Sequence, residues 1–164
     1  MGIQPSSCVV TRSGRIEVFE DKPLKGILSS GMTPVLYGDV VFDLEKGFSI
    51  LSGDQIVSYL AIHLNSDRII IGTDVDGLYT EDPKRNPDAE LIDRITLDEL
   101  RKMIKAIGES STVDVTKGMY GKILELIPAI KEGVKVLIVN AKERNRVFKA
   151  LTNEEVYGTF ITRS

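Results

Sequence analysis

Cysteine and histidine are nearly absent from this sequence, each occurring once in 164 residues. Because Cys8 has no second cysteine to pair with, an internal disulfide is excluded and a reducing compartment is expected. His63 is the only histidine, and nothing around it suggests a zinc site or a Ser-His-Asp set. Metal and nucleophile chemistry of these kinds is therefore not expected.

Long apolar runs and a strong net charge are missing too. No apolar run approaches the ~20 residues that a membrane-spanning helix needs, and residues 1–15 lack the apolar core of a signal peptide. The net charge is only -3, which gives no electrostatic reason to expect nucleic acid or an anionic membrane as a partner. We therefore expect a cytoplasmic protein that binds neither of them.

Strand-like and helix-like segments alternate along the chain. β-rich runs on both sides of Ser13-Gly14 predict a hairpin over residues 8–19. Further strands are predicted from "TPVLYGDVVFD", "FSIL", "RIII", "VKVLIVN" and "YGTFIT". Helices are predicted over residues 21–31, 52–64, 96–107, 119–133 and 142–154.

Local signals mark the ends of some of these helices. Ser52 with Gln55, and Thr96 with Glu99, have the spacing of a capping box, in which each side chain bonds an amide at the helix start. Pro128 lies inside the fourth predicted helix, and an interior proline costs about 3 kcal/mol. We therefore expect that helix to be kinked or shortened.

The alternation of elements predicts an α/β fold. We expect one domain over residues 1–164, built as a three-layer sandwich with a largely parallel sheet. In such sheets, ligands bind at the carboxyl ends of the strands. The segment 69–83, "IIIGTDVDGLYTEDP", begins with a buried strand, so we expect residues 72–83 to lie on the ligand-binding face.

The polar part of that segment has two interpretations. Asp74 opens a pattern similar to a calcium loop, but that loop needs a glutamate at its twelfth position, where this chain has Arg85. One interpretation is a nucleotide cradle in which Tyr79 and the acidic turn 81–83 wall a base or ribose. The other is a polar loop made of turn-forming residues. This segment alone does not decide between them.

Two glycine-containing segments have the features of phosphate contacts. In "SILSGDQ", Ser52-Gly53 turns into a helix whose amino end offers amides and a partial positive charge. Asp54, in the first turn, is equally explained as a helix-start carboxylate. In "DVTKGMYGK", Gly118 permits close approach of the backbone to a ligand, and Lys122 lies within reach of a phosphate. A lone lysine on a helix is more often simply solvated.

Taken together, "YGDVVFD", "FSILSGD", "GTDVDGLYTEDP" and "DVTKGMYGK" resemble the amino acid kinase superfamily. Within it, the sequence is most similar to the archaeal-type isopentenyl phosphate kinases, mainly through "ILSGD". The resemblance covers nearly the whole chain. It implies an ATP-dependent kinase of isoprenoid biosynthesis, a transferase that converts isopentenyl phosphate and ATP to isopentenyl diphosphate and ADP.

The resemblance also implies roles for single residues. Gly53 would face the acceptor phosphate, and Asp54 would orient lysines around the transferred phosphoryl group instead of acting as a base. Lys122 would neutralise charge during transfer. The residues implied to bind ATP are Asp74, Tyr79, Asp82, Pro83, Lys84, Gly118 and Lys122. Magnesium would arrive with the nucleotide, so no metal ligands are expected from the chain itself.

The chain departs from the family pattern at its start. Family members are longer, and their first strand with its lysine, first glycine-rich loop and histidine-bearing acceptor pocket have no counterpart here. We therefore expect a truncated member. Residues 1–45 would be a remnant of the acceptor-binding half, and residues 46–164 would be the nucleotide-binding half.

Two consequences are expected from this departure. The isolated chain should bind nucleotide weakly and transfer phosphate poorly or not at all. An unpaired strand edge and an uncovered apolar face should produce a homo-oligomer or association with a chain that supplies the missing half. The alternatives are another small-molecule kinase of the superfamily, a non-catalytic nucleotide-binding module, and a relic without activity.

Overall fold

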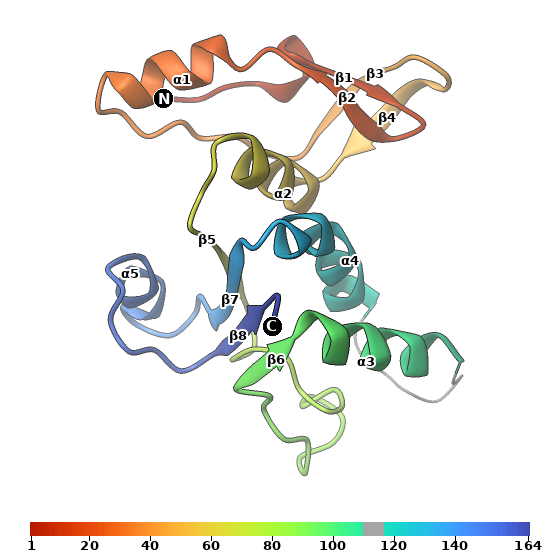
Figure 1. Ribbon diagram of the computed structural model, residues 1–164, viewed down its shortest axis with the longest axis vertical. Coiled ribbons are helices and arrows are strands. Elements are labelled where there is room, and N and C mark those ends of the chain that lie inside the picture. Colours follow the sequence, from red (N-terminus) through yellow and green to blue (C-terminus); the bar gives the residue numbers. More distant parts are fainter. Residues whose placement is uncertain (110–116) are drawn as a thin grey trace. The chain divides into compact units, whose positions relative to one another are not determined.

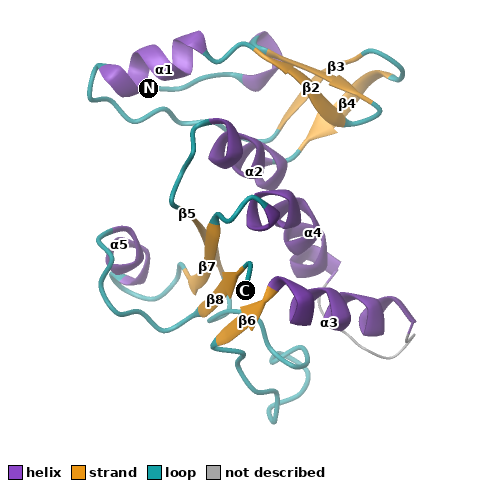
Figure 2. Ribbon diagram, viewed as in Figure 1, coloured by secondary structure: helices purple, strands orange, loops and turns teal. Residues whose placement is uncertain are grey.

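The computed structural model describes the backbone of residues 1–109 and 117–164 and the side chains of residues 1–105 and 118–164. The chain divides into two compact units, Met1–Tyr59 and Leu60–Ser164. The division falls inside helix α2 (Gly53–His63), and each unit has its own four-stranded sheet (Figures 1 and 2). The assignment of the two parts of the sequence to acceptor and nucleotide stays a prediction.

The first unit is a pair of β-hairpins joined side by side. It contains the short 3-10 turn η1 (Pro5–Ser7), helix α1 (Lys22–Ser29) and strands β1 (Val9–Arg12), β2 (Arg15–Phe19), β3 (Asp39–Asp43) and β4 (Gly47–Leu51). The sheet order is β2-β1-β3-β4. The two hairpins are antiparallel, and β1 and β3 join them in parallel. The hairpin predicted around Ser13-Gly14 is confirmed, and both turn residues have positive φ, 51° and 83°.

The two faces of this sheet differ in what covers them. Val9, Val41 and Leu51 are buried on one face. On the other face, alternate residues form a continuous apolar row that crosses all four strands, because Val18 pairs with Val10, Val10 with Phe42, and Phe42 with Phe48. We call this surface the apolar face; its members are Val10, Val18, Val40, Phe42, Phe48 and Ile50, of which all but Val10 are exposed.

The second unit is a layered α/β structure. Its strands are β5 (Arg68–Thr73), β6 (Arg94–Thr96), β7 (Lys135–Asn140) and β8 (Thr159–Thr162), in the order β5-β7-β8-β6. Its further helices are α3 (Leu97–Glu109), α4 (Lys117–Lys131) and α5 (Arg146–Leu151). In Figure 1, α5 lies on one side of this sheet, and α3 and α4 lie on the other. This is the predicted three-layer arrangement.

Strand β7 is buried on both faces, as expected for a strand between two helical layers. Leu137 and Val139 pack with Ala150 and Val147 of α5, and Val136 and Ile138, which point the other way, are also buried. The fold is therefore confirmed as α/β.

The prediction of a largely parallel sheet needs refinement. Pairs β5–β7 and β6–β8 are parallel, but β7–β8 is antiparallel, so both sheets are mixed. Gly158 lies just before β8, and a Cβ there would clash with the backbone oxygen of Ile138 on β7 and lie 3.0 Å from Val139 Cγ1. Only a residue without a side chain allows β8 to start against β7 at this point.

Several helix ends differ from the sequence prediction. Helix α5 covers Arg146–Leu151 and is shorter than expected, because Asn145 and Asn153 have left-handed backbones (φ 61° and 65°) that bracket it. Helix α4 is not shortened at Pro128, since it continues to Lys131. Pro128 has no N–H to donate to the carbonyl of Leu124, and Leu124 lies on the exposed side of the helix.

Only one of the two capping boxes is complete. Glu99 Oε2 accepts from Thr96 N at 2.8 Å, and Glu99 N donates to Thr96 Oγ1 at 3.4 Å. At α2, Gln55 N donates to Ser52 Oγ at 3.1 Å, but the Gln55 side chain bonds elsewhere. Its Oε1 accepts from Ile16 N at 3.1 Å, and its Nε2 donates to Gly14 O at 3.2 Å, which ties α2 to the first hairpin.

No helix in the described parts of the chain is both long enough and apolar enough to cross a bilayer.

Candidate functional site

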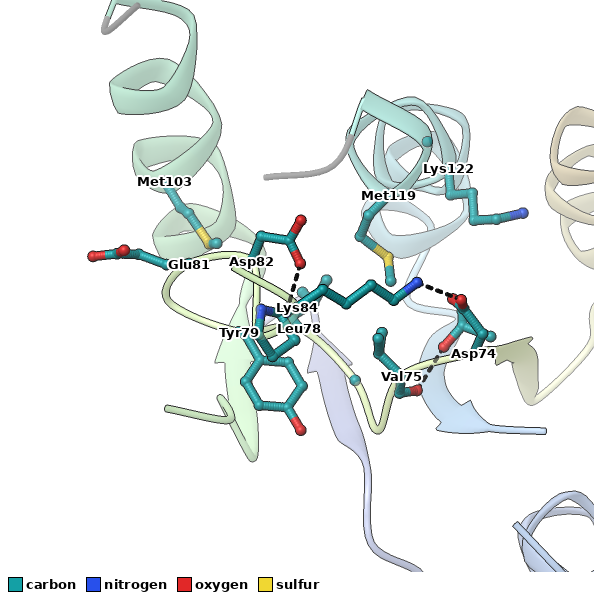
Figure 3. A pocket seen from close by; sticks show the side chains of 14 residues that line it. Asp74, Val75, Leu78, Tyr79, Glu81, Asp82, Lys84, Met103, Met119 and Lys122 are labelled. Carbon is teal, nitrogen blue, oxygen red and sulfur yellow. Dashed lines mark hydrogen bonds and ion pairs between the residues drawn. The ribbon is translucent and has the colours of Figure 1, made fainter. Parts of the chain in front are cut away.

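A cavity of about 210 Å³ lies in the second unit, between the loop that follows β5 and the helices α3 and α4 (Figure 3). The seven residues that the family resemblance assigned to ATP all line it: Asp74, Tyr79, Asp82, Pro83, Lys84, Gly118 and Lys122. Apolar wall residues are Val75, Leu78, Met103 and Met119. Residues 48 positions apart along the chain thus meet at one hollow, at the carboxyl end of β5, where an α/β sheet binds its ligands.

An ion pair crosses this cavity. Lys84 Nζ donates to Asp74 Oδ2 at 2.6 Å, as Figure 3 shows, and Lys142 Nζ lies 3.9 Å from the same oxygen. The hydrogen bond and charge of Lys84 lower the pKa of Asp74, and Asp74 in turn raises the pKa of Lys84. Asp74 therefore stays ionised at neutral pH and holds two cations beside the cavity.

Asp76 ties the loop to the rest of the unit. Its carboxylate forms an ion pair with Arg146 and accepts from Asn140 Nδ2 at 3.3 Å. The Tyr79 hydroxyl donates to Asp76 Oδ2 at 3.3 Å. Burial raises the pKa of Tyr79, and the charge of Asp76 raises it further. Tyr79 thus lines the cavity, but its hydroxyl is directed toward Asp76.

In the turn after Tyr79, hydrogen bonds to Glu81 and Asp82 fix the backbone. Asp82 is buried, and its Oδ1 accepts from Lys84 N at 2.9 Å. The carbonyl of Asp82 accepts from Arg85 N and Asn86 N. Glu81 accepts from Asn86 Nδ2 at 2.8 Å. In the structure, Asp82 therefore builds the loop that presents Pro83 and Lys84 to the cavity.

Gly77 is required by packing. A Cβ at this position would clash with Thr159 Oγ1 and lie 3.0 Å from Leu91 Cδ1. The buried Thr159 hydroxyl accepts from Leu78 N at 2.8 Å, which fixes the loop to β8.

The opposite wall comes from the start of α4 and from α3. Gly118, Met119 and Lys122 lie in the first turns of α4, and Met103 projects from α3 (Figure 3). A Cβ added to Gly118 would meet no atom within 4 Å. Packing against the described residues therefore does not require a glycine at position 118, whereas packing against Thr159 does require one at position 77.

Gly53 and Asp54 belong to the first unit and begin helix α2. Gly53 is exposed, and a Cβ there would meet nothing within 4 Å. Ser52 caps Gln55, so the helix start is ordered, and Asp54 lies in its first turn as predicted. Such a helix start attracts an anion through its amides and its dipole.

Residues 1–140 of the chain match the family model described as the amino acid kinase family. The chain belongs to this family. An isopentenyl phosphate kinase of Methanothermobacter thermautotrophicus is 42% identical over 99% of the chain, and one of Methanocaldococcus jannaschii is 37% identical over 98%. An X-ray structure of isopentenyl phosphate kinase is 39% identical and superposes with a TM-score of 0.82 over 99% of the chain.

These relatives of the amino acid kinase family are longer than this chain. The chain spans 60% of the M. thermautotrophicus protein, 57% of the M. jannaschii protein and 59% of the crystallised kinase.

A resident metal site is not formed by the described side chains. Among residues 1–105 and 118–164, no three histidine, cysteine, aspartate or glutamate side chains gather as a metal cluster. The one carboxylate at the ion pair, Asp74, is already paired with Lys84.

The sequence did not reveal several residues that position the loop and the walls. Arg146, Asn140 and Thr159 hold the loop after β5 from 64 to 81 residues away along the chain. Met119 had a local signal, since it lies between glycines in "KGMYGK", whereas Met103 had only its place on an apolar helix face.

Proposed function

We propose that this chain supplies the nucleotide-binding part of an ATP-dependent kinase that phosphorylates isopentenyl phosphate to isopentenyl diphosphate. The observation that carries the proposal is that the seven family positions for ATP line a single cavity. The identity to two isopentenyl phosphate kinases, 42% and 37%, supports the choice of acceptor.

The base and ribose would enter the cavity, and the phosphates would extend beyond it. A volume of about 210 Å³ is below the roughly 300–1,000 Å³ of pockets that bury a drug-sized molecule. It therefore suits one end of a nucleotide. Lys84 and Lys122 supply positive charge for the phosphates, and Gly118 leaves room for their close approach to α4.

Features of the first unit support a phosphate acceptor with an apolar tail. The start of α2 at Gly53 suits the acceptor phosphate. Ile50 precedes it on β4 and pairs with Val40 on β3, and both side chains are exposed, 79% and 54%. This end of the apolar face would contact an isopentenyl tail, while Asp54 would orient lysines around the transferred group.

Phosphoryl transfer to a phosphate acceptor needs little acid–base chemistry from the protein. The attacking oxygen of a phosphate monoester is already ionised, so the work consists of positioning and charge neutralisation. Mg²⁺ would enter with ATP and would supply further positive charge at its phosphates. Lys122, on a helix that begins only five residues earlier, is the residue we propose for neutralising charge during transfer.

The first test is calorimetric titration of the chain with Mg·ATP, comparing the wild type with Lys122→Ala. Loss of a cation that contacts phosphate should weaken binding about tenfold or more, since charge-assisted contacts contribute about 1.5–3 kcal/mol. Lys131→Ala is the matched control, because Lys131 is an exposed lysine at the other end of the same helix. Equal binding by all three proteins would contradict the role of Lys122.

The second test concerns transfer. The chain alone should turn over isopentenyl phosphate poorly, because about two fifths of the length of the M. thermautotrophicus relative lies outside the matched region. Adding the unmatched part of the M. thermautotrophicus protein in trans should raise transfer. Transfer to uridylate or glutamate instead would favour another small-molecule kinase, and ATP binding without any transfer would favour a nucleotide-binding module.

A further inference from the structure

We infer that the cavity accepts a nucleobase by shape and apolar contact and does not read the hydrogen-bonding edge of the base, so that ATP and GTP bind alike. The inference rests on the proposed function, because it concerns the same site.

The inner walls of the cavity are apolar and adaptable. Leu78, Val75 and Pro83 line it from the loop, and Met103 and Met119 line it from two different helices (Figure 3). Methionine side chains are unbranched and polarizable, and they adjust to ligands of different outline. Two thioethers on this wall therefore give a flat base good contact without a geometric preference for one purine.

The polar side chains that the loop contributes to the wall are already engaged within the protein. The Thr73 hydroxyl donates to Val75 O at 2.7 Å. The Tyr79 hydroxyl donates to Asp76, and Asp74 is paired with Lys84. Glu81 accepts from Asn86, and Asp82 accepts from Lys84 N.

Much of the loop backbone is engaged as well. Leu78 N donates to Thr159, and Leu78 O accepts from Ile92 N at 2.8 Å. Thr80 N donates to Glu90 O at 3.0 Å. A base that required these groups would have to break bonds that hold the loop to β8 and to the segment around Leu91.

Discrimination between purines depends on such groups. A site built to hydrogen-bond a substrate rejects the wrong analogue by about 10⁴–10⁵, whereas an apolar pocket discriminates only about 10–200-fold. Adenine and guanine have the same ring system and differ in the polar groups on its edge. Their outlines do not differ by an added or missing apolar group, so we expect discrimination at the lower end of the apolar range, with dissociation constants for Mg·ATP and Mg·GTP within about tenfold of each other.

The experiment is titration of the chain with Mg·ATP, Mg·GTP and Mg·tripolyphosphate. The two nucleotides should agree within about tenfold, and tripolyphosphate should bind more than about tenfold more weakly, because it lacks the base that fills the cavity. Met103→Ala and Met119→Ala should each weaken both nucleotides by the same factor and leave tripolyphosphate unchanged. Met32→Ala is the control, since Met32 is exposed in the first unit.

The outcomes separate this inference from the proposed function. A preference for ATP over GTP greater than tenfold would overturn the inference and leave the proposed function standing. Tripolyphosphate binding as tightly as ATP would also overturn it, because the base would then lie outside the cavity. Binding of none of the three ligands would overturn both. Met103→Leu, which conserves volume, should keep nucleotide binding and so controls for loss of folding in the alanine variants.

Discussion

Gly77 and Gly118 both lie beside the cavity but meet different surroundings. A side chain at Gly77 would collide with Thr159, so this glycine keeps the loop on β8. A Cβ at Gly118 would meet none of the described residues within 4 Å, so their packing leaves room beside the cavity at this position. At the scale of single residues, Gly77 in the loop after β5 is needed for packing. Gly118, on the helix across the cavity, leaves room for a ligand.

Gly118→Ala should change stability and binding in opposite directions. Within α4, alanine is favoured over glycine by up to about 1 kcal/mol, so the variant should unfold at a slightly higher temperature. Its methyl group should obstruct the phosphates and weaken Mg·ATP binding, measured by calorimetry. Gly121→Ala is the control, because Gly121 is in the same helix, also has open space and does not line the cavity. Equal binding by both variants would argue against a phosphate at Gly118.

At the scale of elements, a single carboxylate joins the two hairpins of the first unit. Asp43 is 1% exposed and ends β3. It accepts from Gly14 N at 2.7 Å and Ser13 N at 3.2 Å in the first hairpin turn, and from Glu45 N and Lys46 N at 3.0 Å in the second. Burial favours a raised pKa, but these amides and the Thr11 hydroxyl outweigh it and hold the pKa of Asp43 far below its usual value.

Asp43→Asn should therefore destabilise the first unit in a pH-dependent way. Because the folded pKa is lowered, the carboxylate stabilises the fold above about pH 4 and loses this effect as the pH falls toward the folded pKa. At pH 7 the variant should melt roughly 5 °C lower, and the difference should narrow below about pH 4. Glu17→Gln, which alters only an exposed pair with Arg12, should show neither effect. A constant difference across the pH range would show that Asp43 acts without its charge.

At the scale of the whole molecule, the chain consists of two compact units. It spans 60% of the length of the M. thermautotrophicus relative. The described chain exposes Phe42, Phe48 and Ile50 by 59%, 69% and 79% on the apolar face of the first unit. Exposed apolar surface of this kind favours association.

We predict that the chain alone self-associates through the apolar face. Light scattering over a range of concentrations should give a rising mass for the wild type. The double variant Phe42→Ser, Phe48→Ser should shift the chain toward monomer, because it removes the two aromatic rings of the cross-strand pair. Phe148→Ser, which changes a phenylalanine of α5 that is 61% exposed, should not. A wild-type chain that stays monomeric throughout would contradict the prediction.

The sequence alone predicted features that depend on residues a few positions apart. The turn at Ser13-Gly14, the capping box of Thr96 and Glu99 and the loop after β5 all have local causes, namely backbone preference, a side chain within one turn and the end of an apolar run. The site residues in residues 72–83 and 114–122 could be assigned to one nucleotide site from the sequence only because the family resemblance covers both segments.

Only the tertiary structure decided which distant groups meet. Gln55 bonds to the first hairpin and leaves its capping box incomplete, Arg146 pairs with Asp76, and Thr159 holds Leu78. The antiparallel direction of the β7–β8 pair is likewise a feature of the tertiary structure. These contacts join residues 39, 70 and 81 positions apart. The preferences of neighbouring residues do not determine such partners. A side chain can bond to a distant group only after the folded core has brought the two within reach of each other.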